Sequence, residues 1–409
     1  MGLCVWLVAL GPSYSQGELD PADPPATGMK RLDQIHPGTA ITTTPVLLTA
    51  PGYYYLAGNL DLRTGTGITI RSSDITLDLN GFEIGGQPGS TAIAAPGPAT
   101  GYSNIVVRNG SIHGGQFGVS LTNTQNATLR DLSINGTSSS AILIQGTGGV
   151  SCGNRVEECA IFECGSGISV RESDGNSIRS CLVNSPGGSA ISLYGAASHC
   201  DANTIEDCLL RGGNITLNAD SSGRCRGNTI RRCTVSEAGI GICCHAYDAG
   251  TPGNGGILEG TVIDQCAVHE MDPFYGIFLD GRGGLTRGNR IAECAVSNCE
   301  DFGIALVADA DGSCAGNSVV LCVTHNTGIE GIRLNEANAN RVQDNHLVSA
   351  AVGITLIGSD RNIIMHNSGG NLNVLLSGTT SDTKGPVVTA TGTLANSGNS
   401  VHPWANFDR

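Results

Sequence analysis

The side chains best suited to acid–base chemistry gather in one irregular stretch, residues 245–282. His269 and Arg282 could exchange a proton with a substrate, while Asp272 and Asp280 could orient that substrate or hold a metal ion. On a sugar chain, such a set would support elimination, hydrolysis or epimerisation.

The stretch opens with His245, Tyr247 and Asp248 in a glycine-rich segment. These three residues could frame a pocket. The alternative is that they decorate a long surface loop, where polar and aromatic residues are common.

His325 repeats the position of His269. Each lies three residues past a cysteine, Cys266 or Cys322, so a regular repeat would put both on one face, two coils apart, with Ser297 between them. Parallel strands lie about 4.8 Å apart, which predicts a Cα–Cα separation of about 10 Å. The competing interpretation is that both histidines are solvated, because outward positions of an exported repeat protein must be polar.

Asp309 and Asp311 stand in the sequence Asp-Ala-Asp-Gly, which is similar to a fragment of a calcium-binding loop. The other ligands of a complete loop are missing, and Asx turns favour the same residue types. Calcium is the one cofactor that the sequence suggests, with a purely structural turn as the alternative.

A repeat of roughly 22 to 32 residues positions these side chains. Its unit is N-x-[IV]-x-x-C-x-[VIL], then a variable turn, then G-I-x-[LV]. Short β-branched runs alternate inward and outward with period two, and glycine and asparagine supply the turns. Because each run is too short to bury a face alone, the coils must stack and pair in parallel, about 11–12 coils in all. The repeat asparagines are Asn154, Asn176, Asn203, Asn228, Asn289, Asn317, Asn340 and Asn362.

The cysteines follow this repeat and not a disulfide framework. Stacked thiols are small and apolar and suit an inward corner, whereas a linear column lacks the converging geometry of a zinc site. The column is Cys159, Cys181, Cys208, Cys233, Cys266, Cys294 and Cys322, continued by Asn345 and Asn367. A second group, Cys152, Cys200, Cys225 and Cys314, is expected to form another stacked corner.

Charge and composition restrict the partners. The net charge is −14, and the only lysines are Lys30 and Lys384. Nucleic acid is therefore excluded as a partner, because phosphate contacts need clustered cations. A polyanionic substrate would also be repelled on average. Aromatic residues make up only 4% of the chain, which disfavours a sugar-stacking cleft.

The two ends differ from the repeat. Met1 to Leu10 form a short apolar run followed by small residues, which predicts a signal peptide over 1–16. An extension over 17–50, the helix over 51–378 and a tail over 379–409 would follow. A secreted, periplasmic or cell-surface location is expected. No other stretch is apolar and long enough to span a membrane.

The stretch PGYYYLAGNLDL, followed by GITIRSSDITLDLNGFEIGG, NIVVRNGSIHGG and the ending HPWANF, resembles exported bacterial right-handed β-helix repeat proteins of the pectate-lyase-like superfamily. The resemblance covers nearly the whole chain. It implies an all-β fold, a single-stranded right-handed parallel β-helix (solenoid). That scaffold carries lyases, hydrolases, epimerases and noncatalytic adhesins, so it does not decide the function.

Known catalytic motifs are absent. The chain has neither the Asp-Asp pair nor the Arg-Ile-Lys triplet of polygalacturonase-like hydrolases. We therefore expect an extracellular β-helix that presents a face to a polysaccharide or a cell-surface glycan. The alternative is a polysaccharide lyase, hydrolase or epimerase that acts at the irregular coil 245–282, with His269, Asp272, Asp280, Arg282 and His325 as candidate catalytic residues.

Overall fold

The computed structural model describes residues 38–147, 150–196, 198–220, 222–247, 255–378, 381–389 and 398–408. From Thr39 onward the chain forms one compact unit. The expected signal peptide over 1–16 lies outside the described residues. Within them the chain contains strands and turns but no α-helix, and so no helix long and apolar enough to cross a membrane.

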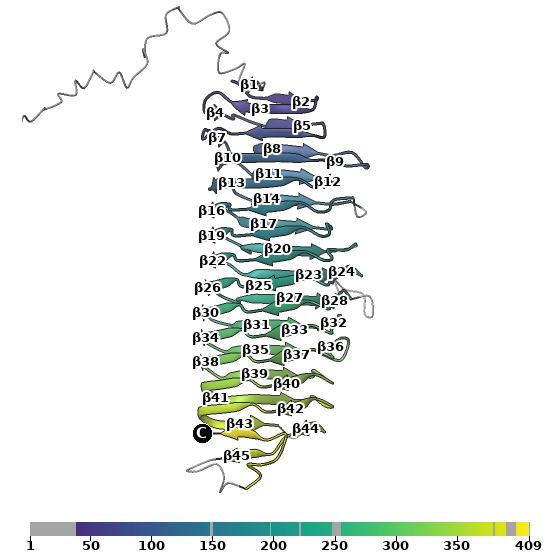
Figure 1. Cartoon of the computed structure of the whole chain (residues 1–409), viewed down its shortest axis with the longest axis vertical. Helices are drawn as coiled ribbons and strands as arrows, with labels where there is room; N and C mark the ends of the chain where they lie inside the picture. Colours follow the sequence, from purple (N-terminus) through teal and green to yellow (C-terminus); the bar gives the residue numbers. More distant parts are fainter. Residues whose placement is uncertain are drawn as a thin grey trace, which may run out of the picture. The chain divides into compact units, whose positions relative to one another are not determined.

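Each coil contributes three short strands to three parallel sheets. In one coil these are β15 (Arg155–Glu157), β16 (Ala160–Phe162) and β17 (Ser166–Arg171). They pair in parallel with β18 (Ser177–Arg179), β19 (Leu182–Asn184) and β20 (Ile191–Gly195) of the next coil. This stacking, visible from β3 to β43 in Figure 1, repeats for about 12 turns and confirms the predicted solenoid.

The first sheet contains, besides β15 and β18, β1 (Thr39–Ile41), β3 (Gly52–Leu56), β6 (Ile75–Asp78), β10 (Ile105–Gly114), β13 (Thr128–Asn135), β21 (Thr204–Glu206), β25 (Thr229–Arg231), β29 (Val262–Asp264), β33 (Arg290–Ala292), β37 (Ser318–Val320), β40 (Arg341–Gln343), β42 (Ile363–Met365) and β44 (Thr383–Lys384). The second sheet contains the ends of β10 and β13, then β16, β19, β4 (Leu60–Asp61), β7 (Glu83–Gly86), β22 (Leu209–Arg211), β26 (Thr234–Ala238), β30 (Ala267–Met271), β34 (Ala295–Cys299), β38 (Val323–Thr327), β41 (His346–Ile357), β43 (Ser368–Ser377) and β46 (Asn406–Asp408), which also pairs with β45 (Val387–Thr389).

The third sheet carries the candidate site. Besides β17 and β20 and the ends of β41 and β43, it contains β2 (Val46–Leu48), β5 (Thr66–Ile70), β8 (Thr91–Pro96), β11 (Phe117–Thr122), β14 (Ser140–Gln145), β23 (Ile215–Asp220), β27 (Ile242–Tyr247), β31 (Tyr275–Asp280), β35 (Phe302–Val307) and β39 (Glu330–Asn335). Two short sheets flank it: β9 (Tyr102–Ser103) with β12 (Thr124–Gln125), and β24 (Arg224–Arg226), β28 (Ile257–Glu259), β32 (Leu285–Arg287) and β36 (Ser313–Ala315).

The repeat asparagines hold one corner together. Asn203 Oδ1 accepts a hydrogen bond from the backbone N–H of Asn176 at 2.9 Å. The backbone N–H of Asn203 donates in turn to Asn228 Oδ1 at 2.8 Å. Asn203 is 1% exposed. Because each amide satisfies backbone groups of a neighbouring coil, the column replaces hydrogen bonds that the turning backbone cannot make.

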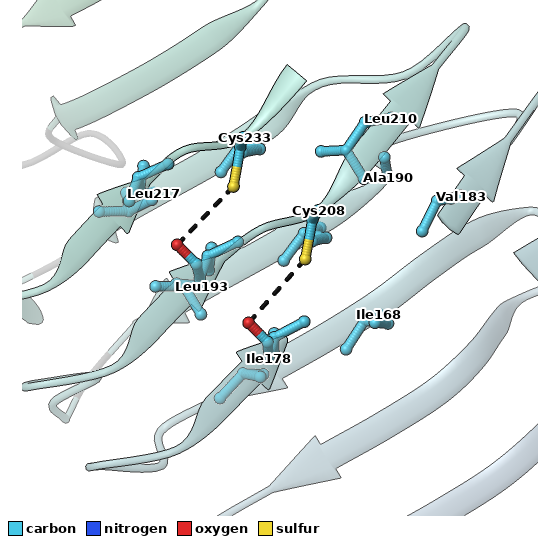
Figure 2. Close-up of a cluster of buried hydrophobic side chains, with 14 of the residues drawn as sticks. Ile168, Ile178, Val183, Ala190, Leu193, Cys208, Leu210, Leu217 and Cys233 are labelled. Carbon is cyan, nitrogen blue, oxygen red and sulfur yellow. Dashed lines mark hydrogen bonds between the residues drawn. The ribbon is translucent and has the colours of Figure 1, made fainter. Parts of the chain in front are cut away.

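The column cysteines are buried at a second corner. Figure 2 shows Cys208 and Cys233 at the same position of neighbouring coils, with each sulfur directed toward a backbone carbonyl. Cys208 Sγ lies 3.9 Å from the Ile178 carbonyl oxygen, and Cys233 Sγ lies 3.7 Å from that of Ile205. No disulfide joins the described cysteines. Inside the coils, one continuous apolar cluster runs from Ile41 to Leu375.

Parallel pairing extends beyond the expected range 51–378 at both ends. Strands β1 and β2 pair with β3 and β5, and β46 pairs with β43. Asn406 even continues an asparagine column, since its Oδ1 accepts the backbone N–H of Asn367 at 3.0 Å. The sequence conceals these coils because their strands are only three residues long and the last repeat spans 39 residues.

Candidate functional site

The outer face of the third sheet brings polar side chains of consecutive coils into one row. The backbone register pairs Tyr194 with Asn218, Asn218 with His245, and His245 with Asp280. Each residue directly follows the second inward-facing side chain of its strand, which is Leu193, Leu217, Cys244 or Leu279. Side chains two residues apart share a face of a strand, so the row points outward.

Asp280 is the hub of a charged network in this row. Its carboxylate accepts two hydrogen bonds from the Arg282 guanidinium, at 2.9 and 2.7 Å, and one from the Arg282 backbone N–H at 3.0 Å. His245 Nδ1 lies 3.0 Å from Asp280 Oδ2. The structure therefore brings together Asp280 and Arg282, two of the predicted site residues, and joins them to His245.

Protonation follows from this geometry. Burial alone would raise the pKa of Asp280, but the hydrogen bonds from His245 and Arg282 outweigh it and lower that pKa to about 2. The hydrogen bonds to Asp280 raise the pKa of Arg282. Asp280 is thus ionised and Arg282 keeps its proton at neutral pH, which suits charge-assisted binding and not proton abstraction by Arg282.

His245 is engaged at both ring nitrogens. Nε2 lies 2.7 Å from the sulfur of Cys243, and burial raises the pKa of that thiol well above its ordinary value. A protonated thiol donates, so Nε2 accepts and the Nδ1–H is donated to Asp280. Cys243, His245 and Asp280 form the chain of contacts of a nucleophile–base–carboxylate triad, but Cys243 is only 1% exposed. A substrate cannot reach this sulfur without displacement of its neighbours.

An aromatic cluster covers the same face. Phe278 and Phe302 are buried although they point outward, and together with Cys243 and Ala305 they form an apolar cluster separate from the interior. The half-buried ring of Tyr275 stacks on both, with centroids 4.7 Å from Phe278 and 5.2 Å from Phe302. We call Tyr275, Phe278 and Phe302 the outer aromatic cluster.

Two guanidinium groups and one imidazole extend this cluster. The Arg333 guanidinium lies 4.6 Å from the centroid of Phe302, and the Arg282 guanidinium lies 5.8 Å from that of Phe278. The imidazole of His245 meets Phe278 edge-on at 5.6 Å. Such contacts orient planar groups beside hydrogen-bond donors.

A hollow of about 560 Å³ opens beside the network, lined by Asn218, His245, Tyr247, Asp280 and Arg282. Tyr247, one of these lining residues, is 37% exposed. The Tyr194 hydroxyl donates to Asp220 at 3.0 Å, and burial together with this bond raises the pKa of Tyr194 to about 12. Tyr194 is consequently a neutral hydrogen-bonding group and not a base.

His269 and His325 lie elsewhere, on the second sheet. The register pairs His269 with Ser297 and Ser297 with His325, which confirms that the two histidines share a row two coils apart. Asp280 belongs to the third sheet, so the structure does not bring either histidine into the Asp280 network. His325 is exposed, and the Nδ1 of His269 lies 3.8 Å from Glu270 Oε2.

Asp272 lies at the corner between the second and third sheets. It lines a hollow of about 790 Å³ together with Glu237, Glu270 and Glu300. A hydrogen bond with Asp272 raises the pKa of Glu300, because one shared proton relieves the repulsion between two carboxylates.

The Asp309 carboxylate is hydrogen-bonded to backbone groups. Its Oδ1 accepts the N–H of Gly283 in the preceding coil at 3.0 Å and that of Asp311 at 3.2 Å. The second bond is the Asx turn considered for this sequence, and Asp311 is exposed.

Sequence reasoning missed the partnership of His245 with Asp280 and the outer aromatic cluster. Alignment of the third-sheet strands on their inward residues would have found the first, because His245 and Asp280 each follow the second inward residue, Cys244 or Leu279. The cluster has no such signal, since Tyr275 and Phe302 come from different strands whose rings meet only after the coils stack. Asp248 lies outside the described residues.

Comparison with known proteins identifies the fold. A family model described as right handed beta helix region matches residues 57–205 and 199–368. A search of curated proteins found no match. The structure is similar to the mannuronan C-5 epimerase A-module of Azotobacter vinelandii, with TM-score 0.51 and 12% identity over 82% of this chain and 91% of that one. It is also similar to a mutant tailspike protein of E. coli bacteriophage HK620 in complex with a pentasaccharide, with TM-score 0.50 and 12% identity over 88% and 71%.

Identities this low show the fold alone. The family model, by contrast, spans well over half of the sequence. The chain belongs to the right-handed β-helix family.

Proposed function

We propose that this protein binds a polysaccharide on the outer face of its third sheet, across β23, β27 and β31. The observation that carries the proposal is a hollow of about 560 Å³ lined by the Asp280–Arg282–His245 network and by the partly exposed ring of Tyr247. Carbohydrate sites combine flat apolar rings with a few fixed polar groups. The low overall aromatic content does not oppose this function, because Tyr247 lines the hollow and Tyr275, Phe278 and Phe302 gather on the same face.

Charge favours a neutral polysaccharide. Asp280 and Arg282 neutralise each other across a direct ion pair. The net charge of −14 repels a dense polyanion. The similar structures, a mannuronan epimerase and a tailspike with a bound pentasaccharide, support carbohydrate as the ligand class. Export, which the amino terminus predicts, would bring this face to extracellular glycans.

Binding suits the network better than catalysis does. Both nitrogens of His245 are occupied, Arg282 holds its proton, and Asp280 accepts four hydrogen bonds. None of the three has an atom ready to exchange a proton with a substrate.

Affinity electrophoresis and calorimetry of the purified chain test the proposal, with neutral and acidic polysaccharides and with and without calcium. Tyr247→Ala should weaken binding of the best neutral ligand at least about tenfold, which corresponds to about 1.4 kcal/mol. Trp404→Ala is the matched control, since Trp404 is another exposed aromatic residue, 49% exposed, near the carboxyl terminus. Equal affinity of both variants, or no binding by the folded protein, would contradict the proposal.

A second candidate function is glycoside hydrolysis at the acidic corner. The carboxyl groups of Asp272 and Glu300 face each other there, and the hydrogen bond between them raises the pKa of Glu300. Glycoside hydrolases act with a pair of carboxyl groups. A release of reducing ends without absorbance at about 235 nm would identify a hydrolase, whereas new absorbance would identify a lyase. Activity that survives in both Asp272→Asn and Glu300→Gln would exclude this corner.

A further inference from the structure

Three metal-ligating side chains converge at the corner between the third and first sheets. Asp174 and Asp201 occupy the same position of consecutive coils, two residues before Asn176 and Asn203. His199 lies between them, with Nδ1 2.5 Å from Asp174 Oδ2. One ligand atom from each of the three lies within 4.8 Å of the others, and no second group of this kind occurs in the described parts of the chain.

Hydrogen bonds hold the two carboxylates in place. Asp174 Oδ1 accepts the backbone N–H of Asp201 at 2.8 Å. Asp201 Oδ1 accepts a hydrogen bond from the backbone N–H of Arg226 at 2.9 Å. Its Oδ2 accepts one from the Arg224 guanidinium Nε at 2.8 Å. Each oxygen keeps a second lone pair. The carboxylates are therefore fixed by neighbours of the kind that orient metal ligands in proteins.

The charge pattern of this corner changes at the same place. Further along the column, opposite charges alternate: Arg226 pairs with Glu259 at 3.2 Å, and Glu259 pairs with Arg287 at 3.0 Å. Asp174 and Asp201 instead put two carboxylates on adjacent coils, and Arg224 neutralises only one of them. A cation between them would complete the pattern.

The imidazole gives an independent indication. His199 Nδ1 is shielded from solvent and makes no hydrogen bond of acceptable geometry, although a carboxylate oxygen lies 2.5 Å away. This shielded nitrogen faces two carboxylates without a hydrogen bond of acceptable geometry, a position suited to a metal ligand.

We propose that Asp174, His199 and Asp201 bind a divalent first-row transition metal ion, with Zn²⁺ as the expected occupant. One imidazole nitrogen with two carboxylate oxygens suits zinc, cobalt or nickel, whereas calcium and magnesium prefer oxygen ligands alone. Three protein ligands leave a fourth position open to water or to a ligand hydroxyl. The site is separate from the Asp309 turn and does not depend on the proposed carbohydrate function.

Titration of the full, chelator-stripped chain with Co²⁺ and Zn²⁺ tests this inference. Calorimetry should detect one tight ion per chain, and Co²⁺ should give weak visible bands without the intense near-ultraviolet absorption of thiolate ligation. Asp174→Asn and His199→Gln should each reduce the affinity about 100-fold or more. His325→Gln is the matched control, because His325 is exposed on the second sheet and should leave the affinity unchanged.

Circular dichroism of each variant separates lost ligands from lost folding, since both substitutions lie at a surface corner. Undiminished affinity in the folded Asp174→Asn and His199→Gln variants would overturn the site. Thiolate absorption, or the absence of tight binding in the wild type, would also overturn it; the short His199–Asp174 contact would then be an ordinary ion pair.

Discussion

The outer faces of the second and third sheets have the same regular backbone register, but their outward side chains differ in solvent exposure. On the second sheet, His269, Ser297 and His325 form a row of separate side chains in contact with solvent. On the third sheet, Phe278 is 3% exposed and Asp280 4% exposed, although both also point outward. Strand geometry is common to both faces, so the neighbouring side chains make the difference.

Side-chain size accounts for the difference in exposure between the two faces. On the third sheet, rings from β31 and β35 are large enough to cover each other and the polar groups beside them. On the second sheet, small or flexible residues leave Val323 41% exposed. An outward position therefore becomes a site only when adjacent coils supply side chains that exclude water around it.

Loss of one ring should have the largest effect. Phe278→Ala removes the centre of the outer aromatic cluster and should lower the free energy of unfolding by ~3 kcal/mol, as for other buried phenylalanines. Chemical unfolding followed by circular dichroism measures this change. Val323→Ala, an outward residue of the second sheet, should change it by less than ~0.5 kcal/mol. Similar losses in the two variants would mean that the faces do not differ in packing.

The fold could be predicted almost completely from the sequence, for a physical reason. In a solenoid each coil contacts mainly its neighbours, so one inward pattern such as Ile178, Cys181 and Val183 recurs with every coil. The end coils escaped prediction because short strands such as β1 and a widely spaced Asn406 carry little periodicity.

The candidate site could be predicted only in part. Asp280 and Arg282 are two residues apart, and their pairing is a local event. His245 is 35 residues from Asp280, and the loop length between their strands hides the register that joins them. The choice of His269 instead of His245 followed the cysteine column, which indexes the second sheet and carries no information about the third.

Loss of the buried carboxylate should have an intermediate effect. Asp280→Asn removes the charge that holds Arg282 and His245, and should lower the free energy of unfolding at pH 7 by ~2–3 kcal/mol. Glu270→Gln, at an exposed carboxylate of the second sheet, should change it by less than ~0.5 kcal/mol. A loss at Asp280 no larger than that at Glu270 would show that the network adds nothing to stability.

The pH dependence sharpens the same comparison. Because the pKa of Asp280 is lowered from 3.8 to about 2 on folding, its ionised form favours the folded state by ~2 kcal/mol. This stabilisation is fully present above about pH 4 and is lost as the pH falls toward 2. The stability difference between wild type and Asp280→Asn should accordingly shrink over that window. A difference that stays constant from pH 5 to pH 2 would contradict the assigned ionisation.

The smallest effect is expected on the second sheet. His269→Ala and His325→Ala remove side chains that lie in register on the second sheet and do not line the hollow of the third sheet. Each should change the free energy of unfolding by less than ~0.5 kcal/mol and leave polysaccharide affinity unchanged, as measured by chemical unfolding and calorimetry. A tenfold loss of affinity in either variant, with Tyr247→Ala unaffected, would move the binding face to the second sheet. Register alone would then be enough to make a site, and the covering rings of the third sheet would serve stability only.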